Sequence, residues 1–135
     1  MNYLIDTHIF LWLLFEPNRI PSKMMKILKD PSYTIAISSI SFWEISLKYN
    51  LGKLELQGST PDELPLLAKK MGLVIEEIAS QEMASFHKLE KDSKHKDPFD
   101  RIIIWHCISH KRTLISLDGK FANYEKYGLQ RLKEN

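Results

Sequence analysis

The chain has 135 residues, of which 44% are hydrophobic and 27% are charged, and its formal net charge at pH 7 is +2. This length fits one domain that buries about two-thirds of its unfolded surface, and the composition is ordinary for a globular protein. Its one cysteine, Cys107, excludes an internal disulfide and suits a reducing cytosol. The apolar stretch after Met1 is interrupted by Asp6 and Glu16 and is too short to cross a membrane. We therefore expect a cytoplasmic protein with no membrane association.

The hydrophobic pattern alternates between strands and helices along the chain. Short apolar or β-branched runs predict strands over 2–5, 33–37, 73–75, 113–117 and 129–132. Helical spacing predicts helices over 8–15, 22–30, 38–51, 61–70, 80–89 and 98–110, and a small helix after residue 119. The segment 90–96 is the most loop-like. Alternating strands and helices favour parallel pairing through right-handed crossovers, so we predict one α/β domain over 1–135 with a mainly parallel central sheet flanked by helices.

Four acidic residues lie where a predicted strand ends or a predicted helix begins: Asp6, Glu44, Asp100 and Asp118. Because ligands bind beyond the carboxyl ends of parallel strands, we expect these carboxylates to converge at one edge. Such a cluster repels itself unless a cation neutralises it. Hard oxygen ligands, without cysteine or histidine at matching spacing, favour Mg²⁺ or Mn²⁺. In a basic protein, a carboxylate-held metal indicates phosphodiester chemistry.

Each of these acids also has a purely structural explanation. Asp6 and Asp97 could cap helices, Ser41 and Glu44 match a capping box, and Asp118 with the following glycine fits an ordinary turn. Caps explain why each acidic residue is tolerated. They do not explain acids at every entry to one edge of the sheet, so we favour the metal site.

Four segments resemble the signature stretches of the PIN-domain nucleases, specifically the VapC-type toxins of prokaryotic toxin–antitoxin pairs: LIDTHIFLWLL, ISSISFWEISLKYNLGKLEL, HKDPFDRIII and TLISLDGKF. The resemblance runs from Met1 to about Tyr127, and its most specific pieces are SFWEISLK and HKDPFDR. It implies an endoribonuclease that uses one or two Mg²⁺ or Mn²⁺ ions to activate water and hydrolyse RNA. It also implies a toxin that pairs with a small antitoxin covering the acidic site and that forms a homodimer.

The resemblance assigns roles to individual residues. The metal-binding and catalytic acids would be Asp6, Glu44, Asp100 and Asp118, with Asp97 as a nearby supporting carboxylate. The supporting hydroxyls would be Thr7, Ser38 and Ser116. Flanking phosphates could be held by Lys48, Lys96 and Arg101, although Arg101 pairs as easily with Asp97 four residues earlier, and we favour that pairing. Trp105, His106 and Cys107 depart from the small residues of the family, and a role beyond packing stays open.

Other interpretations compete with a metal-dependent ribonuclease. His106 and His110 share a helix face, as in zinc enzymes, but no glutamate follows His106 and no third histidine has a fixed offset. An aspartyl-phosphate phosphatase would need a second aspartate two residues after Asp6, where this chain has His8. A non-catalytic RNA- or protein-binding module of the same fold, or a housekeeping PIN nuclease in RNA processing, are further alternatives.

Two surface features also have two explanations each. The lysine-rich run over 88–96 either attracts a polyanion or is a solvated loop. The large side chains of Trp12, Phe15, Phe42 and Trp43 either all belong to the core or leave an exposed patch for a protein partner.

Overall fold

The computed structural model describes residues 2–92 and 94–132, so both ends of the predicted 1–135 domain lie outside the described residues. Within these ranges one sheet contains β1 (Asn2–Ile5), β2 (Thr34–Ser38), β3 (Val74–Glu76), β4 (Thr113–Ile115) and β5 (Gln130–Arg131). The strand order is β3-β2-β1-β4-β5, and every neighbouring pair is parallel. The predicted α/β class is confirmed.

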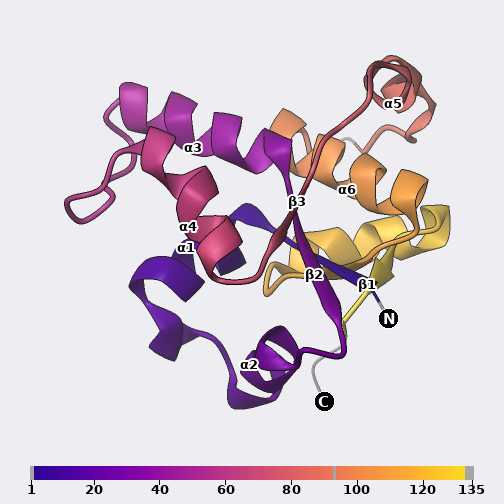
Figure 1. The fold of residues 1–135 in the computed structure, drawn as a ribbon. Helices are drawn as coiled ribbons and strands as arrows, with labels where there is room; N and C mark the ends of the chain where they lie inside the picture. Colours follow the sequence, from indigo (N-terminus) through magenta and orange to yellow (C-terminus); the bar gives the residue numbers. More distant parts are fainter. Residues whose placement is uncertain (1, 93, 133–135) are drawn as a thin grey trace.

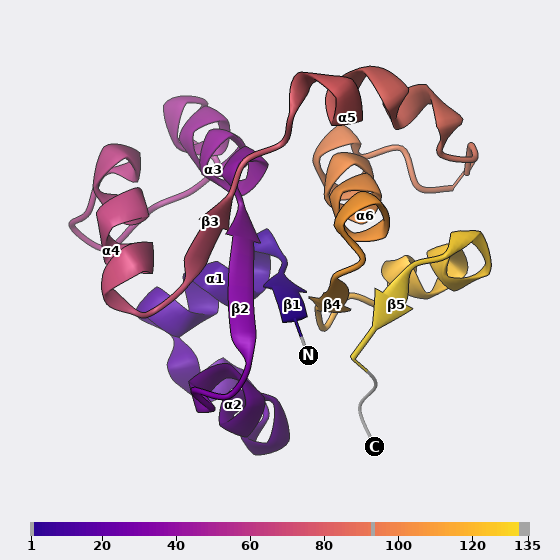
Figure 2. The same cartoon turned by 45° about the vertical axis from the view of Figure 1, so that its right-hand side comes forward.

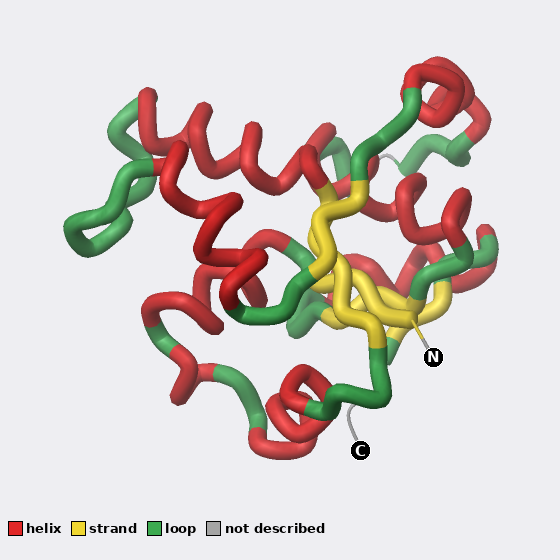
Figure 3. Tube along the Cα trace, in the orientation of Figure 1, coloured by secondary structure: helices red, strands yellow, loops and turns green. Residues whose placement is uncertain are grey.

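Helices connect the strands and cover the sheet (Figure 3). The α-helices are α1 (Thr7–Phe15), α2 (Ser22–Lys29), α3 (Ser39–Asn50), α4 (Leu64–Lys70), α5 (Ser80–Ser85) and α6 (Pro98–His110). The 3₁₀ helices are η1 (Pro17–Arg19), η2 (Pro61–Glu63), η3 (Phe86–Lys88) and η4 (Gly119–Tyr127). None of the described helices combines the length and the apolar character needed to span a membrane.

Two predicted helices differ from the observed ones. The helix predicted over 61–70 begins as η2, where the side chain of Glu63 accepts a hydrogen bond from the N–H of Thr60 at 3.3 Å. The helix predicted over 80–89 ends as α5 at Ser85 and continues as η3. Periodicity alone does not distinguish a tight 3₁₀ turn from an α-helical one over so few residues.

Side chains alternate between two hydrophobic cores, one on each face of the sheet. Residues 3, 5, 35, 37 and 115 face a core completed by α1, α2 and α4, which Figure 1 shows on the left of the strands. Leu4, Ala36 and Leu114 face the other core, which α6 and η4 close. Figure 2 shows α6 on the opposite side of the sheet from α1 and α4. Burial of both faces explains why the strands read as continuous apolar runs.

The strand register places the carboxyl ends of four strands at one edge. Ile5 of β1 pairs with Ile37 of β2 and with Ile115 of β4, while Ser38 pairs with Glu76 of β3. The N–H of Asp6 donates to the carbonyl of Ile115 at 3.1 Å, which extends the alignment one residue further. Polar residues at these strand ends therefore share one edge, as the sequence predicts for a parallel sheet.

The large aromatic side chains divide between core and surface. Trp12, Phe15 and Phe42 are partly buried and pack against the core on the α1 face. Trp43 is 58% exposed, and its ring makes an edge contact with Phe99 at a centroid distance of 5.1 Å. Three of the four aromatics thus serve packing, and Trp43 is available to a partner.

Candidate active site

Asp6 connects β1 to α1 and is almost fully buried, with 4% of its surface exposed. Its Oδ1 accepts a hydrogen bond from the N–H of Ile9 at 2.8 Å, so it is the N-cap of α1. Its Oδ2 accepts a hydrogen bond from the hydroxyl of Ser116. Burial raises the pKa of Asp6 to about 6, although both hydrogen bonds act in the opposite direction. The predicted cap is real, and the same carboxylate lies at the expected edge.

Glu44 does not form the capping box that the sequence offers as an alternative. Helix α3 begins at Ser39, and the hydroxyl of Ser38 caps it by accepting from the N–H of Ile40 at 3.2 Å. Glu44 is therefore inside the helix, beyond the reach of the N-cap. Its buried carboxylate accepts from the hydroxyl of Thr7 at 2.7 Å and from the ammonium of Lys48 at 2.5 Å. The carboxylate faces α1 and the edge of the sheet.

Asp97 and Asp100 occupy the first turn of α6. Asp97 caps the helix by accepting from the N–H groups of Phe99 and Asp100 at 2.9 and 3.3 Å, and Pro98 takes the first helical position. Asp100 Oδ2 lies 3.1 Å from Nε2 of His95. Burial raises the pKa of Asp100, and the negative charges of Asp97 and Glu44 raise it further.

His95 lies in the lysine-rich run over 88–96, for which the sequence left open either a polyanion-binding or a solvated loop, and no role was predicted for it. The side chain is buried, and its ring contacts the edges of Phe121 and Tyr124 at centroid distances of 5.9 and 5.4 Å. Its Nε2 holds Asp100, while its Nδ1 is buried without a hydrogen-bond partner among the described residues. Its position in the segment HKDPFD was the only available signal, because flanking lysines make the loop appear uniformly exposed.

Asp118 reaches the site through the backbone. Ser116 donates its hydroxyl proton to Asp6 and accepts from the N–H of Asp118 at 3.0 Å. The carboxylate of Asp118 accepts from the N–H of Lys120 at 2.9 Å and caps η4. The predicted supporting role of Ser116 is thus a specific one: it ties the loop after β4 to the carboxylate after β1.

The electrostatic couplings show which acids lie near one another. The charge of Asp100 raises the pKa of Asp6, and the charges of Asp97 and Glu44 raise that of Asp100. These carboxylates surround one edge, but they do not meet at a point. Within residues 2–92 and 94–132, the acids of this edge do not form a group of three with oxygens within 4.8 Å of one another. Instead, each carboxylate has a partner of its own. Lys48 contacts Glu44 and His95 contacts Asp100, while backbone N–H groups donate to Asp97 and Asp118.

The donors at this edge are carboxylate and hydroxyl oxygens, which suit a hard divalent ion such as Mg²⁺ or Mn²⁺. Asp6, Glu44 and Asp100 are the three predicted acids linked by electrostatic coupling, through Asp100, and would have to move closer together to share an ion. Two hollows adjoin the edge. The first, of about 290 Å³, is lined by Thr7, Glu44 and Lys48 together with Lys53. The second, of about 590 Å³, is lined by Lys91, His95, Lys96 and Arg101 together with Asp92.

Three basic residues predicted to hold phosphates have different surroundings. Burial would lower the pKa of Lys48, but its hydrogen bond to Glu44 and the nearby acidic charges raise it overall, so this lysine neutralises Glu44. Lys96 is exposed at the second hollow and remains the best candidate of the three. Arg101 donates to the carbonyl of Glu90 at 3.1 Å and to the hydroxyl of Tyr124 at 3.2 Å, and not to Asp97 as we had favoured.

Arg101→Met should therefore lower stability more than it lowers RNA binding. The guanidinium joins the loop before α6 to η4, and charge-assisted hydrogen bonds of this kind contribute about 1.5–3 kcal/mol. We expect a loss of that size in the free energy of unfolding, measured by urea denaturation. Lys96→Met is the matched control and should leave stability unchanged while weakening RNA binding. Weaker RNA binding by the Arg101 variant at unchanged stability would contradict the assignment.

The remaining predicted residues contact groups other than the acids Asp6, Glu44 and Asp100. Ser38 lies at the same edge, but its hydroxyl contacts Nδ1 of His106 at 3.0 Å. Trp105 donates its indole N–H to the carbonyl of Glu82 at 2.9 Å. Cys107 is fully buried in the core on the α6 face, where burial strongly raises the pKa of its thiol. It is therefore not available to a metal site shared with His106 and His110.

Comparison with known proteins gives the family. The PIN domain model matches residues 3–127. Solved structures with the same fold include VapBC2 from Rickettsia felis bound to a promoter DNA fragment, at 19% identity and a TM-score of 0.69, covering 100% of both chains. VapBC-1 from nontypeable Haemophilus influenzae matches at 22% identity with a TM-score of 0.69, and the match covers 98% of both chains.

A toxin–antitoxin complex from Klebsiella pneumoniae matches at 20% identity with a TM-score of 0.60, covering 97% of this chain and 96% of that one. The comparison with curated proteins found no match. PIN domains are typically nucleases and generally bind divalent metal ions. Since the family model covers residues 3–127, nearly the whole chain, this protein belongs to the PIN-domain family.

Proposed function

We propose that the chain is a Mg²⁺- or Mn²⁺-dependent endoribonuclease that acts as the toxin of a toxin–antitoxin pair. The observation that carries the proposal is the buried carboxylate of Asp6. It accepts a hydrogen bond from the hydroxyl of Ser116, and the negative charge of Asp100 raises its pKa. Burying an acid with a raised pKa costs stability, and a fold retains such a group where it serves a site. Family membership supports the same conclusion.

The residues would divide the work as follows. One or two divalent ions held by Asp6, Glu44 and Asp100 would activate water and stabilise the leaving oxygen. Thr7 orients Glu44, and His95 orients Asp100. Asp97 and Asp118 supply additional negative charge at the same edge.

The basic side chains would bind the RNA backbone. Lys96 and Lys91 line the hollow beside Asp100 and would hold phosphates that flank the scissile bond. Lys48, which neutralises Glu44, would release that carboxylate when a divalent ion binds. Phosphate contacts position a nucleic acid but do not select its sequence, and the RNA target is therefore set elsewhere.

Glu44→Gln tests the metal site. We expect the wild-type chain to cleave RNA with Mg²⁺ or Mn²⁺, to lose activity in EDTA and to regain it when Mn²⁺ is restored. The variant keeps the helix but loses a charged ligand, so both Mn²⁺ affinity and cleavage should fall at least tenfold, a change on the order of that for an orienting partner. Isothermal titration with Mn²⁺ and a gel assay of cleavage would measure the two quantities.

Glu55→Gln is the matched control, because Glu55 is an exposed glutamate outside the site. It should keep wild-type affinity and activity. EDTA-insensitive RNA binding without cleavage by the wild-type chain would instead support the non-catalytic module.

An antitoxin is proposed as the protein partner. The solved structures from Rickettsia felis and Klebsiella pneumoniae are a VapBC complex and a toxin–antitoxin complex, as their names state. In this chain, exposed Trp43 and its neighbour Phe99 lie next in sequence to Glu44 and Asp100. A partner that contacts this aromatic pair would also cover the acidic edge. From the resemblance to VapC-type toxins, we also propose that two copies of this chain form a homodimer.

A further inference from the structure

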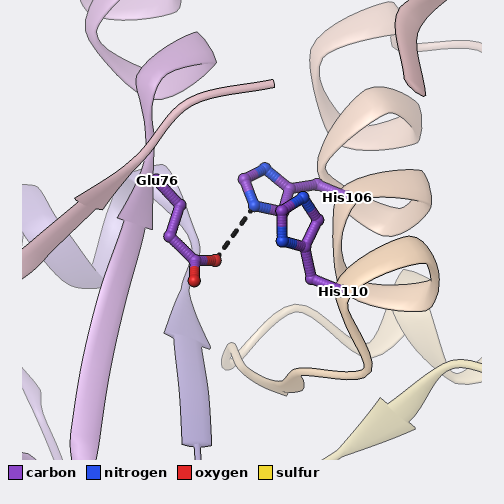
Figure 4. Close-up of side chains that lie close together, drawn as sticks. All are labelled: Glu76, His106 and His110. Atoms are coloured by element: carbon purple, nitrogen blue, oxygen red, sulfur yellow. Dashed lines mark hydrogen bonds and ion pairs between the residues drawn. The ribbon is translucent and has the colours of Figure 1, made fainter. Parts of the chain in front are cut away.

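A second polar cluster lies between the edge strand β3 and the middle of α6. It consists of Glu76 at the end of β3 and His106 and His110 on α6. One carboxylate oxygen and one ring nitrogen from each histidine lie within 4.8 Å of one another. Figure 4 shows the carboxylate of Glu76 directed toward the two imidazole rings.

Glu76 offers one oxygen to the histidines and uses the other elsewhere. Its Oε1 lies 3.1 Å from Nε2 of His106. Its Oε2 accepts from Nε of Arg112 at 2.9 Å and also contacts a terminal nitrogen of the same guanidinium. Burial would raise the pKa of Glu76, but Arg112 and His106 outweigh it and keep the pKa low. The carboxylate is therefore an oriented anion.

Ser38 leaves His106 free to use Nε2 as a lone-pair donor. The hydroxyl of Ser38 lies 3.0 Å from Nδ1, on the far side of the ring from Glu76. When Nδ1–H donates to this hydroxyl, Nε2 carries the lone pair that a metal requires. Metal-bound histidines characteristically donate their other N–H to such an oxygen.

His110 brings a second imidazole ring to the cluster. Its ring lies 4.4 Å from that of His106, measured between centroids. Its Nε2 is in ion-pair contact with the carboxylate of Glu82 on α5. Both atoms are buried and face each other, so the Glu82 carboxylate holds the His110 ring in place. The two rings and the carboxylates of Glu76 and Glu82 thus gather beside the guanidinium of Arg112.

We propose that Glu76, His106 and His110 bind a transition-metal ion, of which Zn²⁺ is the best fit, with Glu82 holding His110. Imidazole nitrogens with one carboxylate oxygen favour Zn²⁺ over Mg²⁺. Tetrahedral bonds of about 2.1 Å place ligand atoms roughly 3.4 Å apart, close to the 3.1 Å between Glu76 and His106. This donor set differs from the all-oxygen set around Asp6, so the two sites select different ions.

The ion would fasten the edge of the sheet. β3 has only three residues, lies at the edge, and pairs with β2 alone in the described sheet. A metal bound by Glu76, His106 and His110 would link the end of β3 to α6, and the contact of His110 with Glu82 would link α5 to the same cluster. The ion would therefore hold together the segment that connects β3 to α6. Its role is structural and does not depend on RNA cleavage.

Co²⁺ and Zn²⁺ titrations of the chelator-treated full chain test the proposal. The titrations use the Asp6→Asn/Asp118→Asn double variant in excess Mg²⁺. Both measures reduce Co²⁺ and Zn²⁺ binding at the acidic edge, so that the signal reports on the histidine cluster. We expect one Co²⁺ per chain with the intense visible absorption of a tetrahedral nitrogen-ligated ion. We also expect micromolar Zn²⁺ to raise the melting temperature, as any ligand of the native state does.

His110→Gln should weaken Co²⁺ and Zn²⁺ binding at least about tenfold and reduce both signals at a given metal concentration. His110 is partly exposed, so this variant should fold; His106→Gln provides a second test at the buried position. His87→Gln is the matched control, an exposed histidine on η3 outside the cluster. Absence of the Co²⁺ band in the parent protein, or equal affinity in the His110 and His87 variants, would overturn the site. Cleavage of RNA is not part of the readout.

Discussion

Asp6→Asn should reduce RNA cleavage at least about 100-fold while the protein stays folded. Asparagine keeps the oxygen that accepts from the N–H of Ile9, so α1 keeps its cap. It loses the charge that a hard cation needs. Since partners that merely orient a ligand contribute 10–100-fold, losing a ligand should cost at least as much. Cleavage by equal amounts of folded wild-type and variant protein measures the effect.

The same substitution should stabilise the protein in metal-free buffer. The folded pKa of Asp6 is raised to about 6, above the unfolded value near 3.9, so ionising the folded carboxyl costs stability. That cost is absent below about pH 4 and is complete above about pH 6. In EDTA, wild-type stability should fall over this window, while the variant should be flatter and about 3 kcal/mol more stable at pH 7.

Asp62→Asn is the control for this experiment. Asp62 is an exposed aspartate on η2, where it accepts from the hydroxyl of Thr60, and its substitution should leave cleavage unchanged. If Asp6 serves only as a helix cap, asparagine replaces it well and the Asp6 variant would cleave RNA normally. That result would remove Asp6 from the site.

The fold could be predicted because local pattern and tertiary structure agree over most of the chain. The strand over 2–5 is observed with those bounds, and the acid after it ends the strand and caps the next helix. The exception at Ser38 shows the limit of pattern. Ser38 ends β2 and caps α3, so the capping-box match at Ser41 and Glu44 was coincidental. Sequence alone does not show which of several hydroxyls begins a helix.

The sequence points to candidate site residues where they follow strands, lie near helix starts or belong to the family-like segments, and these assignments stay predictions. Asp6 and Asp118 carry that signal, and so does Glu76, which the predicted strand over 73–75 stopped one residue short of including. His95 and Arg101 carry no such signal. Their partners are fixed by the packing of the loop before α6 against η4, including Tyr124 more than twenty residues later. Contacts of this kind depend on tertiary structure and leave no periodicity in the chain.

Expression of the intact chain alone in a bacterial host should arrest growth, and the Asp100→Asn form should not. This expectation rests on the proposed toxin role. RNA hydrolysis at about 1–10 s⁻¹, an ordinary enzyme rate, depletes an essential RNA within a generation. Asparagine preserves a contact with His95 but removes the charge coupled to Asp6, Asp97 and Glu44. Colony counts and culture density after induction, at equal expression, measure the difference.

Co-expression with a short neighbouring reading frame should relieve the arrest if that frame encodes the antitoxin. The Trp43→Ala variant separates partner binding from catalysis, because Trp43 is exposed next to Glu44 while its side chain contacts Phe99. We expect this variant to stay toxic and to be rescued less well. Were the wild-type chain harmless at high expression, yet active on RNA in vitro, a housekeeping nuclease of RNA processing would fit better. Harmlessness together with inactivity in Mn²⁺ would instead identify the chain as a binding module.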